Sequence, residues 1–216
     1  KRWLNEQSPT SIYSVGKRIS ITLKIQNYMK IPIILHIMDD WISTEIKPGL
    51  LAFYWKQELN KRLQRLINHS KVHIAISEKM AQEYQNRYKI KWKVFHNPLQ
   101  LKDWLPYQKQ VYDIEDSFKI AFFGRKTSAN SQIIDKLVRI FTENSDKEVK
   151  LEFHIYSQVN AENTEIVSYH DFISHNKLPE TMVKYDLLIL PFFFDKYWTK
   201  YARLSMPTKF SEYLIS

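Results

Sequence analysis

The sequence DLLILP at residues 186–191, followed after a loop by SMPTKFSEYL at residues 205–214, decides the fold that we expect for this chain. The first stretch is short, apolar and closed by a proline, which is typical of a buried strand. The second opens with Ser205 and Pro207, which suit the cap and the first turn of a helix. A strand followed by a helix is therefore predicted here, with Lys209 near the helix N-terminus.

The same alternation of short apolar strands and longer helical patterns recurs along the rest of the chain. The expected strands lie at residues 11–15, 31–37, 72–76, 92–95, 119–123 and 151–156. The expected helices lie at residues 17–30, 48–69 and 131–142, and after Ser77, which suits an N-cap. Alternation of this kind favours parallel strands with right-handed crossovers, so the expected fold class is α/β.

Residues 101–117 show no clear period and separate two alternating halves. We therefore expect a partial N-terminal Rossmann-like domain at residues 1–100, a connector at 101–117 and a partial C-terminal Rossmann-like domain at 118–216. Two such domains would face each other across a cleft. Ligands of open α/β sheets bind beyond the carboxyl ends of the strands, so those ends are where site residues are sought.

The composition restricts the classes of protein to which the chain can belong. Its 216 residues are 44% hydrophobic and carry a formal net charge of +9, so we expect a globular fold whose surface attracts anions. There is no cysteine, and no apolar run approaches the roughly 18 to 20 residues of a membrane span. A cytoplasmic location is the default expectation. No reader motif accompanies the charge, which argues against nucleic-acid binding.

The long helical pattern at residues 48–69 has an apolar side and a basic side. The apolar side consists of Leu51, Tyr54, Trp55, Leu59, Leu63, Leu66 and Ile67, and the basic side of Lys56, Lys61, Arg62 and Arg65. An ordinary surface helix has this pattern. A basic amphipathic helix also lies on anionic membranes, so peripheral attachment to the inner face of the membrane is an open alternative.

Two stretches of the C-terminal half carry residue types that bind phosphate. In the first, a strand runs into Gly124, Arg125 and Lys126; glycine lets the backbone approach a phosphate, and the cations can neutralise it. In the second, Lys209 lies near a helix N-terminus, which favours anions, and Glu212 one turn later can accept hydrogen bonds from a ribose. On local chemistry, a solvated turn and a surface ion pair are the alternatives.

These stretches also resemble a known family. DLLILP, the loop after it and the pattern SxPTKxxEYL resemble the donor-binding region of GT-B glycosyltransferases, particularly the retaining group related to bacterial polysaccharide enzymes. HIAISEKM at residues 73–80 and VFHNP at 94–98 look like the end of the family's N-terminal domain. Residues 119–125 look like the opening strand and phosphate loop of its C-terminal domain, and residues 170–173 like the loop that holds the nucleotide base.

The resemblance implies an activity and a set of donor-binding residues. The activity is transfer of a sugar from a nucleotide diphosphate sugar to a glycan, lipid-linked or protein acceptor, in bacterial surface polysaccharide synthesis and with retention of configuration. The implied donor-binding residues are Gly124, Arg125, Lys126, Ile173, Ser205, Thr208, Lys209 and Glu212. No metal or other cofactor is implied, because Arg125, Lys209 and a helix dipole would stabilise the departing diphosphate.

His36, Asp39 and Asp40 follow or end an apolar strand and are the candidate catalytic residues. Relatives have a histidine and an aspartate near this position that face the acceptor. On this resemblance Asp39 or Asp40 would bind the acceptor or position its hydroxyl. If Asp39 matches the family's aspartate, Met38 takes the histidine position and His36 lies two residues earlier, where it can be buried. A metal site built from all three is an alternative, but adjacent carboxylates on an extended chain point to opposite sides, so no metal is expected.

The chain departs from the family pattern at two places. Many relatives have a glutamate eight positions before the one that matches Glu212, and this position is Leu204 here. The first strand and helix also lack the family's glycine-rich loop, for which truncation at both ends of the chain is the expected explanation, since the family runs to about twice the size of a typical domain. The missing acid supports an alternative function, a catalytically silent module that binds a partner glycosyltransferase or a glycan.

Overall fold

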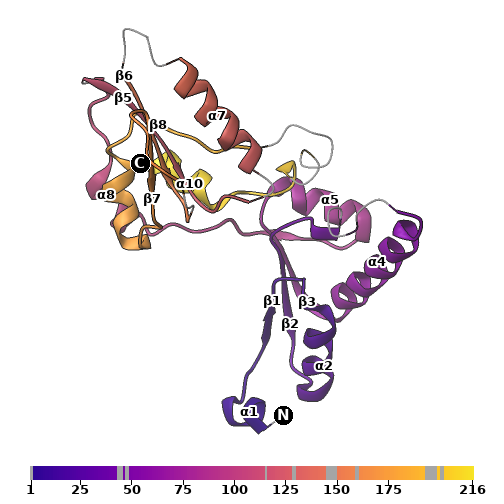
Figure 1. Cartoon of the computed structure of the whole chain (residues 1–216). Helices are drawn as coiled ribbons and strands as arrows, with labels where there is room; N and C mark the ends of the chain where they lie inside the picture. The colour runs from indigo at the N-terminus through magenta and orange to yellow at the C-terminus, as the bar shows by residue number, and fades with distance from the viewer. Residues whose placement is uncertain are drawn as a thin grey trace. The chain divides into compact units, whose positions relative to one another are not determined.

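Two units, each built around a four-stranded parallel sheet, make up the described part of the chain (Figure 1). The structure is a computed structural model that describes residues 2–42, 46, 49–114, 116–127, 130–144, 150–158, 161–192, 199 and 202–216. The first unit comprises Lys1–Asn97 and Thr199–Met206, and the second Pro98–Trp198 and Pro207–Ser216. The expected α/β class is confirmed. The return of the chain to the first unit near its C-terminal end was not expected.

The first unit contains sheet A, with the strand order β1-β2-β3-β4. Its strands are β1 (Ile12–Ser14), β2 (Ile33–Ile37), β3 (Ser70–Ala75) and β4 (Lys93–Val94), all parallel. Its helices are α1 (Arg2–Gln7), α2 (Ile19–Met29), α4 (Ala52–His69) and α5 (Glu78–Tyr88). Except for α1, each was expected within a few residues. Pro48, the expected start of α4, lies outside the described residues.

The core of the first unit explains why its elements form. Ile33, Leu35 and Ile37 of β2 are fully buried, and Leu63, Leu66 and Ile67 of α4 pack in the same cluster. Ser77 caps α5 as expected, because its hydroxyl oxygen accepts a hydrogen bond from the Met80 amide at 3.2 Å. The strands β2 and β3 and the start of α5 are therefore fixed by burial and by a local cap.

The second unit contains sheet B, with the strand order β7-β6-β5-β8. Its strands are β5 (Ser117–Phe123), β6 (Lys150–Tyr156), β7 (Val167–His170) and β8 (Leu187–Leu188), all parallel. Its helices are α6 (Leu101–Trp104), α7 (Ser131–Glu143), α8 (Leu178–Met182) and α10 (Thr208–Ile215), with short 3₁₀ turns η1 (Leu105–Tyr107) and η2 (His175–Lys177). The short helices α6 and η1 lie in the stretch where we expected a connector without regular structure.

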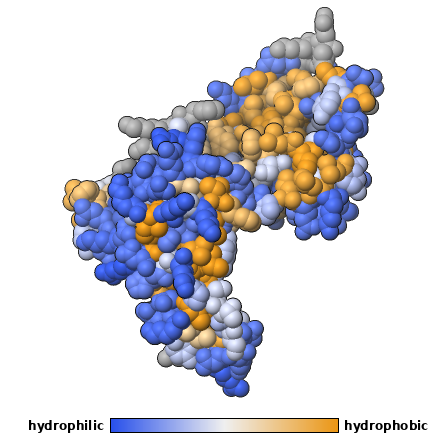
Figure 2. All heavy atoms as spheres, turned by 180° about the vertical axis from the view of Figure 1, so that it is seen from behind, coloured by the Kyte–Doolittle hydropathy of each residue, from blue (hydrophilic) through white to orange (hydrophobic). Residues whose placement is uncertain are grey.

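Sheet B is covered on both faces. Ile120 and Phe122 of β5 face α7, whereas Ala121 and Phe123 face α8 and α10. Large apolar side chains nevertheless stay exposed on this unit, among them Leu187, Phe210 and Leu214. Figure 2, which views the chain from behind, shows a broad hydrophobic area on the second unit. Areas of this kind mark contacts with other protein segments or with lipid. None of the described helices combines the length and hydropathy that crossing a bilayer requires.

Gly16, two residues after β1, has a backbone conformation that other residues rarely adopt. Its φ is +87°, and a Cβ atom there would lie 2.7 Å from Ile37 Cδ1. We expect Gly16→Ala to lower the free energy of unfolding of the first unit by about 1–3 kcal/mol, through left-handed strain and overpacking. Urea unfolding would measure the loss. The control is Gly49→Ala, where an added Cβ meets nothing within 4 Å; an equal effect of both substitutions would contradict the explanation.

His154 and His170 form a hydrogen-bonded pair on the face of sheet B that α8 covers. The two nitrogens, His154 Nδ1 and His170 Nε2, lie 2.9 Å apart, and His154 Nε2 lies 3.5 Å from Glu152 Oε2. The Tyr156 ring stacks on His170, and the Tyr185 ring packs against His154. Burial and the neighbouring His154 lower the pKa of His170 below its ordinary value. The pair therefore requires at least one neutral imidazole.

Acidification should destabilise the second unit through this pair. Because the pKa of His170 is lowered in the folded state, the unfolded chain binds the proton more readily below about pH 6.5. The stabilisation is thus complete above that pH and is lost as the pH falls. We expect the thermal midpoint of the wild type to drop more between pH 7.5 and pH 5.5 than that of His170→Gln. Parallel curves for the two proteins would show that the pair does not contribute.

Candidate functional site

The carboxyl edge of sheet B brings together three positions that the sequence analysis or the fold identifies. Gly124 follows β5, Ser157 follows β6, and Ile173 lies three residues after β7. The Gly124 amide donates to the Tyr156 carbonyl at 3.1 Å, and the Lys126 amide donates to Ser157 Oγ at 3.1 Å. Since the carboxyl ends of parallel strands meet at one edge, the glycine turn is fixed where open α/β sheets bind ligands.

Asn130 holds the described residues of the loop between β5 and α7 in place. Its Oδ1 accepts a hydrogen bond from the Thr127 amide at 2.7 Å, and its Nδ2 donates to the Arg125 carbonyl at 3.1 Å. Helix α7 begins at the next residue, so its N-terminus adjoins the loop. A glycine turn leading into a helix N-terminus is a common anion-binding arrangement. The only sequence signal for Asn130 was its place directly before a helical pattern.

The two cations of this loop differ in their availability. Lys126 Nζ forms an ion pair with Asp135 of α7. Arg125 is exposed, and its side chain forms no hydrogen bond or ion pair with any residue that the structure describes. Arg125 is therefore the cation of the loop that is ready to meet an anion, whereas Lys126 would first have to leave Asp135.

Tyr213 ties α10 to the end of β5. Its hydroxyl oxygen accepts a hydrogen bond from the Phe123 amide at 3.1 Å and donates to the Phe123 carbonyl at 3.3 Å. Burial raises the pKa of Tyr213, so the hydroxyl keeps its proton. Lys209 lies four residues earlier on the same helix face, one turn nearer the N-terminus. This anchor places Lys209 at the same end of sheet B as Gly124, and the sequence analysis had assigned Tyr213 no role.

Lys209 and Glu212 form an ion pair that is only partly solvated. Lys209 Nζ lies 2.5 Å from Glu212 Oε2, and the two side chains are 24% and 10% exposed. The ion-pair alternative of the sequence analysis is thus present in the structure, but it does not exclude a site. Breaking the pair would free one cation and one nearly buried carboxylate at the start of α10.

The expectation that Ser205 caps this helix is wrong. Helix α10 begins at Thr208, and the residue before it, Pro207, has an extended backbone and makes no side-chain cap hydrogen bond. Ser205 and Leu204 belong to the first unit, where Leu204 is 4% exposed and its carbonyl accepts a hydrogen bond from Ser77 Oγ at 2.9 Å. The position of the missing acid is therefore an apolar anchor.

In the first unit, His36 lies within β2 and is 1% exposed. Its Nδ1 is 2.5 Å from the Tyr13 hydroxyl, and its ring packs edge-on against Tyr13 and Phe95. Burial lowers the pKa of His36 below its ordinary value. These contacts are those of a neutral, packed imidazole.

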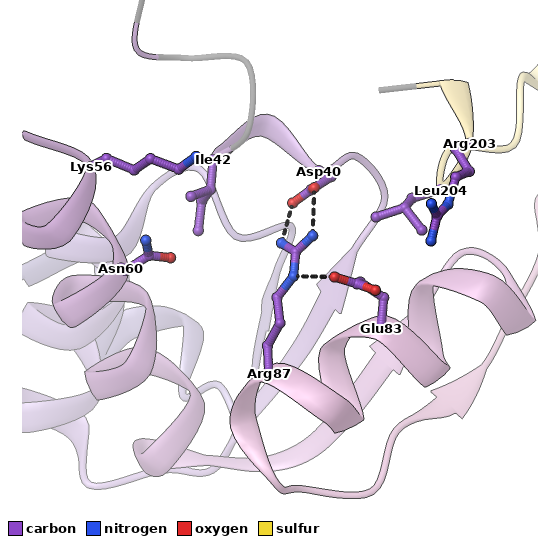
Figure 3. A pocket seen from close by; sticks show the side chains of 8 residues that line it. All are labelled: Asp40, Ile42, Lys56, Asn60, Glu83, Arg87, Arg203 and Leu204. Carbon is purple, nitrogen blue, oxygen red and sulfur yellow. Dashed lines mark hydrogen bonds and ion pairs between the residues drawn. The ribbon is translucent and has the colours of Figure 1, made fainter. Parts of the chain in front are cut away.

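Asp40 forms a buried ion pair with Arg87 (Figure 3). The carboxylate is 1% exposed and receives two hydrogen bonds from the Arg87 guanidinium, at 3.0 and 3.1 Å. The Tyr84 hydroxyl donates a third at 3.0 Å, and Arg87 Nε also bonds to Glu83 at 2.7 Å. Asp39 is the less buried of the two adjacent aspartates. Asp40 is consequently held in one orientation by α5.

A pocket of about 400 Å³ lies beside the Asp40–Arg87 pair, between α4 and α5 (Figure 3). Its lining includes Lys56 and Asn60 of α4, and Arg203 of the segment Thr199–Met206 that belongs to the first unit. Lys56 and Arg203 are exposed and form no ion pair with the described residues. The described residues also contain no group of three or more histidine, aspartate or glutamate side chains that could hold a metal ion.

Comparison with known proteins supports the fold. No protein-family model matches the sequence, and no curated protein matches it. Among solved structures, the chain is similar to sucrose-phosphate synthase from Thermosynechococcus elongatus, with a TM-score of 0.63 over 90% of this chain. The fold class is GT-B. The identity is 9%, and the chain spans 53% of that structure, so the likeness concerns the fold and not the activity.

With the GT-B fold established, three residues stand out that the sequence analysis did not select. Asn130 shapes the loop after β5, Tyr213 anchors α10 to β5, and Arg87 holds Asp40. Each acts through a partner that is distant in the sequence or through a turn whose shape is set by the fold. Only Asn130 had a local signal, its position before a helical pattern.

Proposed function

We propose that this chain transfers a sugar from a nucleotide diphosphate sugar to an acceptor, as glycosyltransferases with the GT-B fold do. The observation that carries the proposal is the carboxyl edge of sheet B, where the Gly124 turn, the exposed Arg125 and the start of α10 lie at one end of the sheet. The similar solved structure is a sucrose-phosphate synthase, which supports the same class of reaction.

In the proposed reaction, the bond between the anomeric carbon and the diphosphate oxygen breaks. A bond forms between that carbon and an acceptor oxygen, which loses its proton. Arg125 and Lys209 oppose the charge on the departing diphosphate, so neither a metal nor another cofactor is part of the proposal. Glu212 orients the ribose and the backbone at Ile173 holds the base. Gly124, Lys126 and Thr208 complete the proposed donor-binding set.

Donor binding in this scheme exchanges one partner of Lys209 for another. The ammonium leaves Glu212 and meets the diphosphate, and Glu212 then accepts hydrogen bonds from the ribose hydroxyls. The 2.5 Å pair in the structure keeps both groups compensated until the donor arrives. Such an exchange favours ligands that carry both a diphosphate and a ribose.

On the acceptor side we propose Asp39 as the residue that positions the acceptor hydroxyl. Asp40 would support this role from its fixed place against Arg87, and the buried, neutral His36 would hold the strand before them. Retention of configuration, a hexose donor and a place in bacterial surface polysaccharide synthesis belong to the same proposal and rest on the sequence resemblance.

A catalytically silent module is the second candidate, and Leu204 favours it. The position where relatives carry a glutamate is an apolar side chain in the core of the first unit. Incubating the chain with UDP-, GDP- and ADP-sugars and measuring release of the nucleoside diphosphate separates the two candidates. Release with one donor supports the transferase, and binding without release supports the silent module. Failure of every nucleotide to bind would contradict both.

We also propose a cytoplasmic protein attached peripherally to the inner face of the membrane. The first part of α4 and the residues before it expose large apolar side chains by half or more: Leu50, Leu51, Phe53, Tyr54 and Trp55. Exposed cations follow on the same helix: Lys56, Lys61, Arg62 and Arg65. The second half of the expected apolar face, Leu63, Leu66 and Ile67, is buried in the core, as in an ordinary surface helix. The first turn, not the whole helix, would therefore contact lipid.

Vesicle sedimentation tests this attachment. We expect the chain to pellet with vesicles that contain anionic lipid and much less with zwitterionic ones, because aromatic burial and positive charge both favour the anionic interface. Replacing Phe53 and Trp55 together by serine should weaken the partitioning by about tenfold or more. The matched control, Leu101→Ser, removes another half-exposed side chain far along the chain. Equal losses in the control would refute a specific role for α4.

A further inference from the structure

One face of α4 combines an apolar, a cationic and an amide side chain in sequence. Phe53 lies three residues before Lys56, and Asn60 lies four residues after it, so the three side chains are neighbours along the helix. Phe53 is 74% exposed. Lys56 and Asn60 line the pocket beside the Asp40–Arg87 pair (Figure 3). The pocket is therefore continuous along one helix face with the exposed Phe53.

The charges of the pocket are unbalanced. Its described lining contains three cations, Lys56, Arg87 and Arg203, and two carboxylates, Asp40 and Glu83. Both carboxylates bond to Arg87. Lys56 and Arg203 are left without an anionic partner among the described residues and approach the pocket from opposite sides in Figure 3. An anionic group in this space would gain charge-assisted hydrogen bonds without displacing an existing ion pair.

The apolar neighbourhood selects among anionic ligands. A soluble sugar phosphate or an inorganic anion would use Lys56 and Arg203 but would leave Leu50, Leu51 and Phe53 facing water. A ligand with a hydrocarbon chain next to its phosphate would use both the cations and the apolar side chains. A volume of about 400 Å³ holds a phosphate or diphosphate with the first groups attached to it, and the chain would continue over the start of α4.

We infer that this pocket binds the phosphate of a lipid phosphate, whose hydrocarbon chain lies against residues 50–55, and that this lipid is the acceptor substrate or its membrane carrier. The second part of the inference rests on the proposed glycosyl transfer; the binding itself does not. Arg203 and Lys56 hold the phosphate, Phe53 contacts the hydrocarbon, and the Asp40–Arg87 pair forms the floor of the pocket.

Calorimetric titration with four soluble probes tests the inference: geranyl phosphate, geraniol, inorganic phosphate and glucose 6-phosphate. The wild-type chain should bind geranyl phosphate at least about tenfold more tightly than each of the other three, since only this probe engages both features. Arg203→Gln and Lys56→Gln should each lower the affinity for geranyl phosphate by about tenfold and leave the affinity for geraniol unchanged. Phe53→Ser should lower the affinity for geranyl phosphate and leave the affinity for inorganic phosphate unchanged.

A control variant and the four probes distinguish the outcomes that would contradict the lipid-phosphate site. Lys61→Gln removes an exposed cation of the same helix outside the pocket and should change nothing. If it acts like Lys56→Gln, or if no phosphate probe binds, the pocket is not an anion site. If glucose 6-phosphate binds as tightly as geranyl phosphate and Phe53→Ser has no effect, the ligand is a soluble phosphate. The titrations contain no nucleotide sugar, so failure of the donor screen would leave the lipid-phosphate site standing.

Discussion

Arg125→Ala and Lys209→Ala are each expected to weaken binding of a nucleoside diphosphate by about ten- to a hundredfold, and to abolish turnover when combined. Each removes a charge-assisted hydrogen bond to the diphosphate, worth about 1.5–3 kcal/mol. Arg125 forms no ion pair with the residues that the structure describes, whereas Lys209 must first leave Glu212. Titration calorimetry with UDP, GDP and ADP measures the affinity, and nucleotide release measures the turnover.

Two further variants keep this prediction interpretable. Lys209→Ala leaves the nearly buried Glu212 without its cation, so a loss of stability could imitate a loss of binding. Lys209→Arg keeps the charge and should restore most of the affinity. Lys136→Ala removes an exposed lysine of α7 and should have no effect. Unchanged affinity and turnover in both alanine variants would contradict a donor site at this edge of sheet B.

Arg87→Met is expected to destabilise the first unit by about 3–5 kcal/mol, the largest of the expected stability effects. The substitution removes both guanidinium hydrogen bonds from the buried carboxylate of Asp40 and keeps the hydrogen bond from the Tyr84 hydroxyl. An uncompensated buried charge is costly, whereas removal of both charges is much less so. The double variant Asp40→Asn with Arg87→Met should therefore recover part of the loss.

Urea unfolding of these variants and of a control gives the measurement. Arg62→Met breaks an exposed pair between Arg62 and Glu58 one turn apart on α4, and should cost less than about 1 kcal/mol. A loss in Arg87→Met no larger than in Arg62→Met would mean that the Asp40 pair is solvated in solution. It would also contradict the statement that the Asp40–Arg87 pair forms a fixed floor of the pocket in the first unit.

The elements that the sequence predicted well are those with strong local signals. β2 and β5 are buried apolar runs, α5 has a serine cap, and α7 has a clear helical period. β7 was missed because its sequence VSYH is short and polar, and it becomes a strand only by pairing with β6. The start of α10 was misplaced because Ser205 looked like a cap, although the segment around it packs in the first unit.

The candidate site residues also divide into those with a local sequence signal and those whose contacts depend on the tertiary fold. Gly124 and Arg125 were predicted from a strand that runs into glycine and cations, and this position follows from the sequence itself. The pairing of Asp40 with Arg87, 47 residues away, and the contact of Ser77 with Leu204, 127 residues away, are products of the tertiary fold. No local pattern distinguishes an aspartate that faces an acceptor from one that is bonded to a helix behind it.

The central claim is that the carboxyl edge of sheet B binds the diphosphate of a nucleotide sugar. The most direct test is titration of the nitrogen-15-labelled chain with UDP, GDP and ADP, followed by amide chemical shifts. The account predicts that one of them shifts the amides of residues 124–127, 157, 173 and 208–212 most strongly. Shifts confined to the first unit, or no shift with any of the three nucleotides at millimolar concentration, would contradict it.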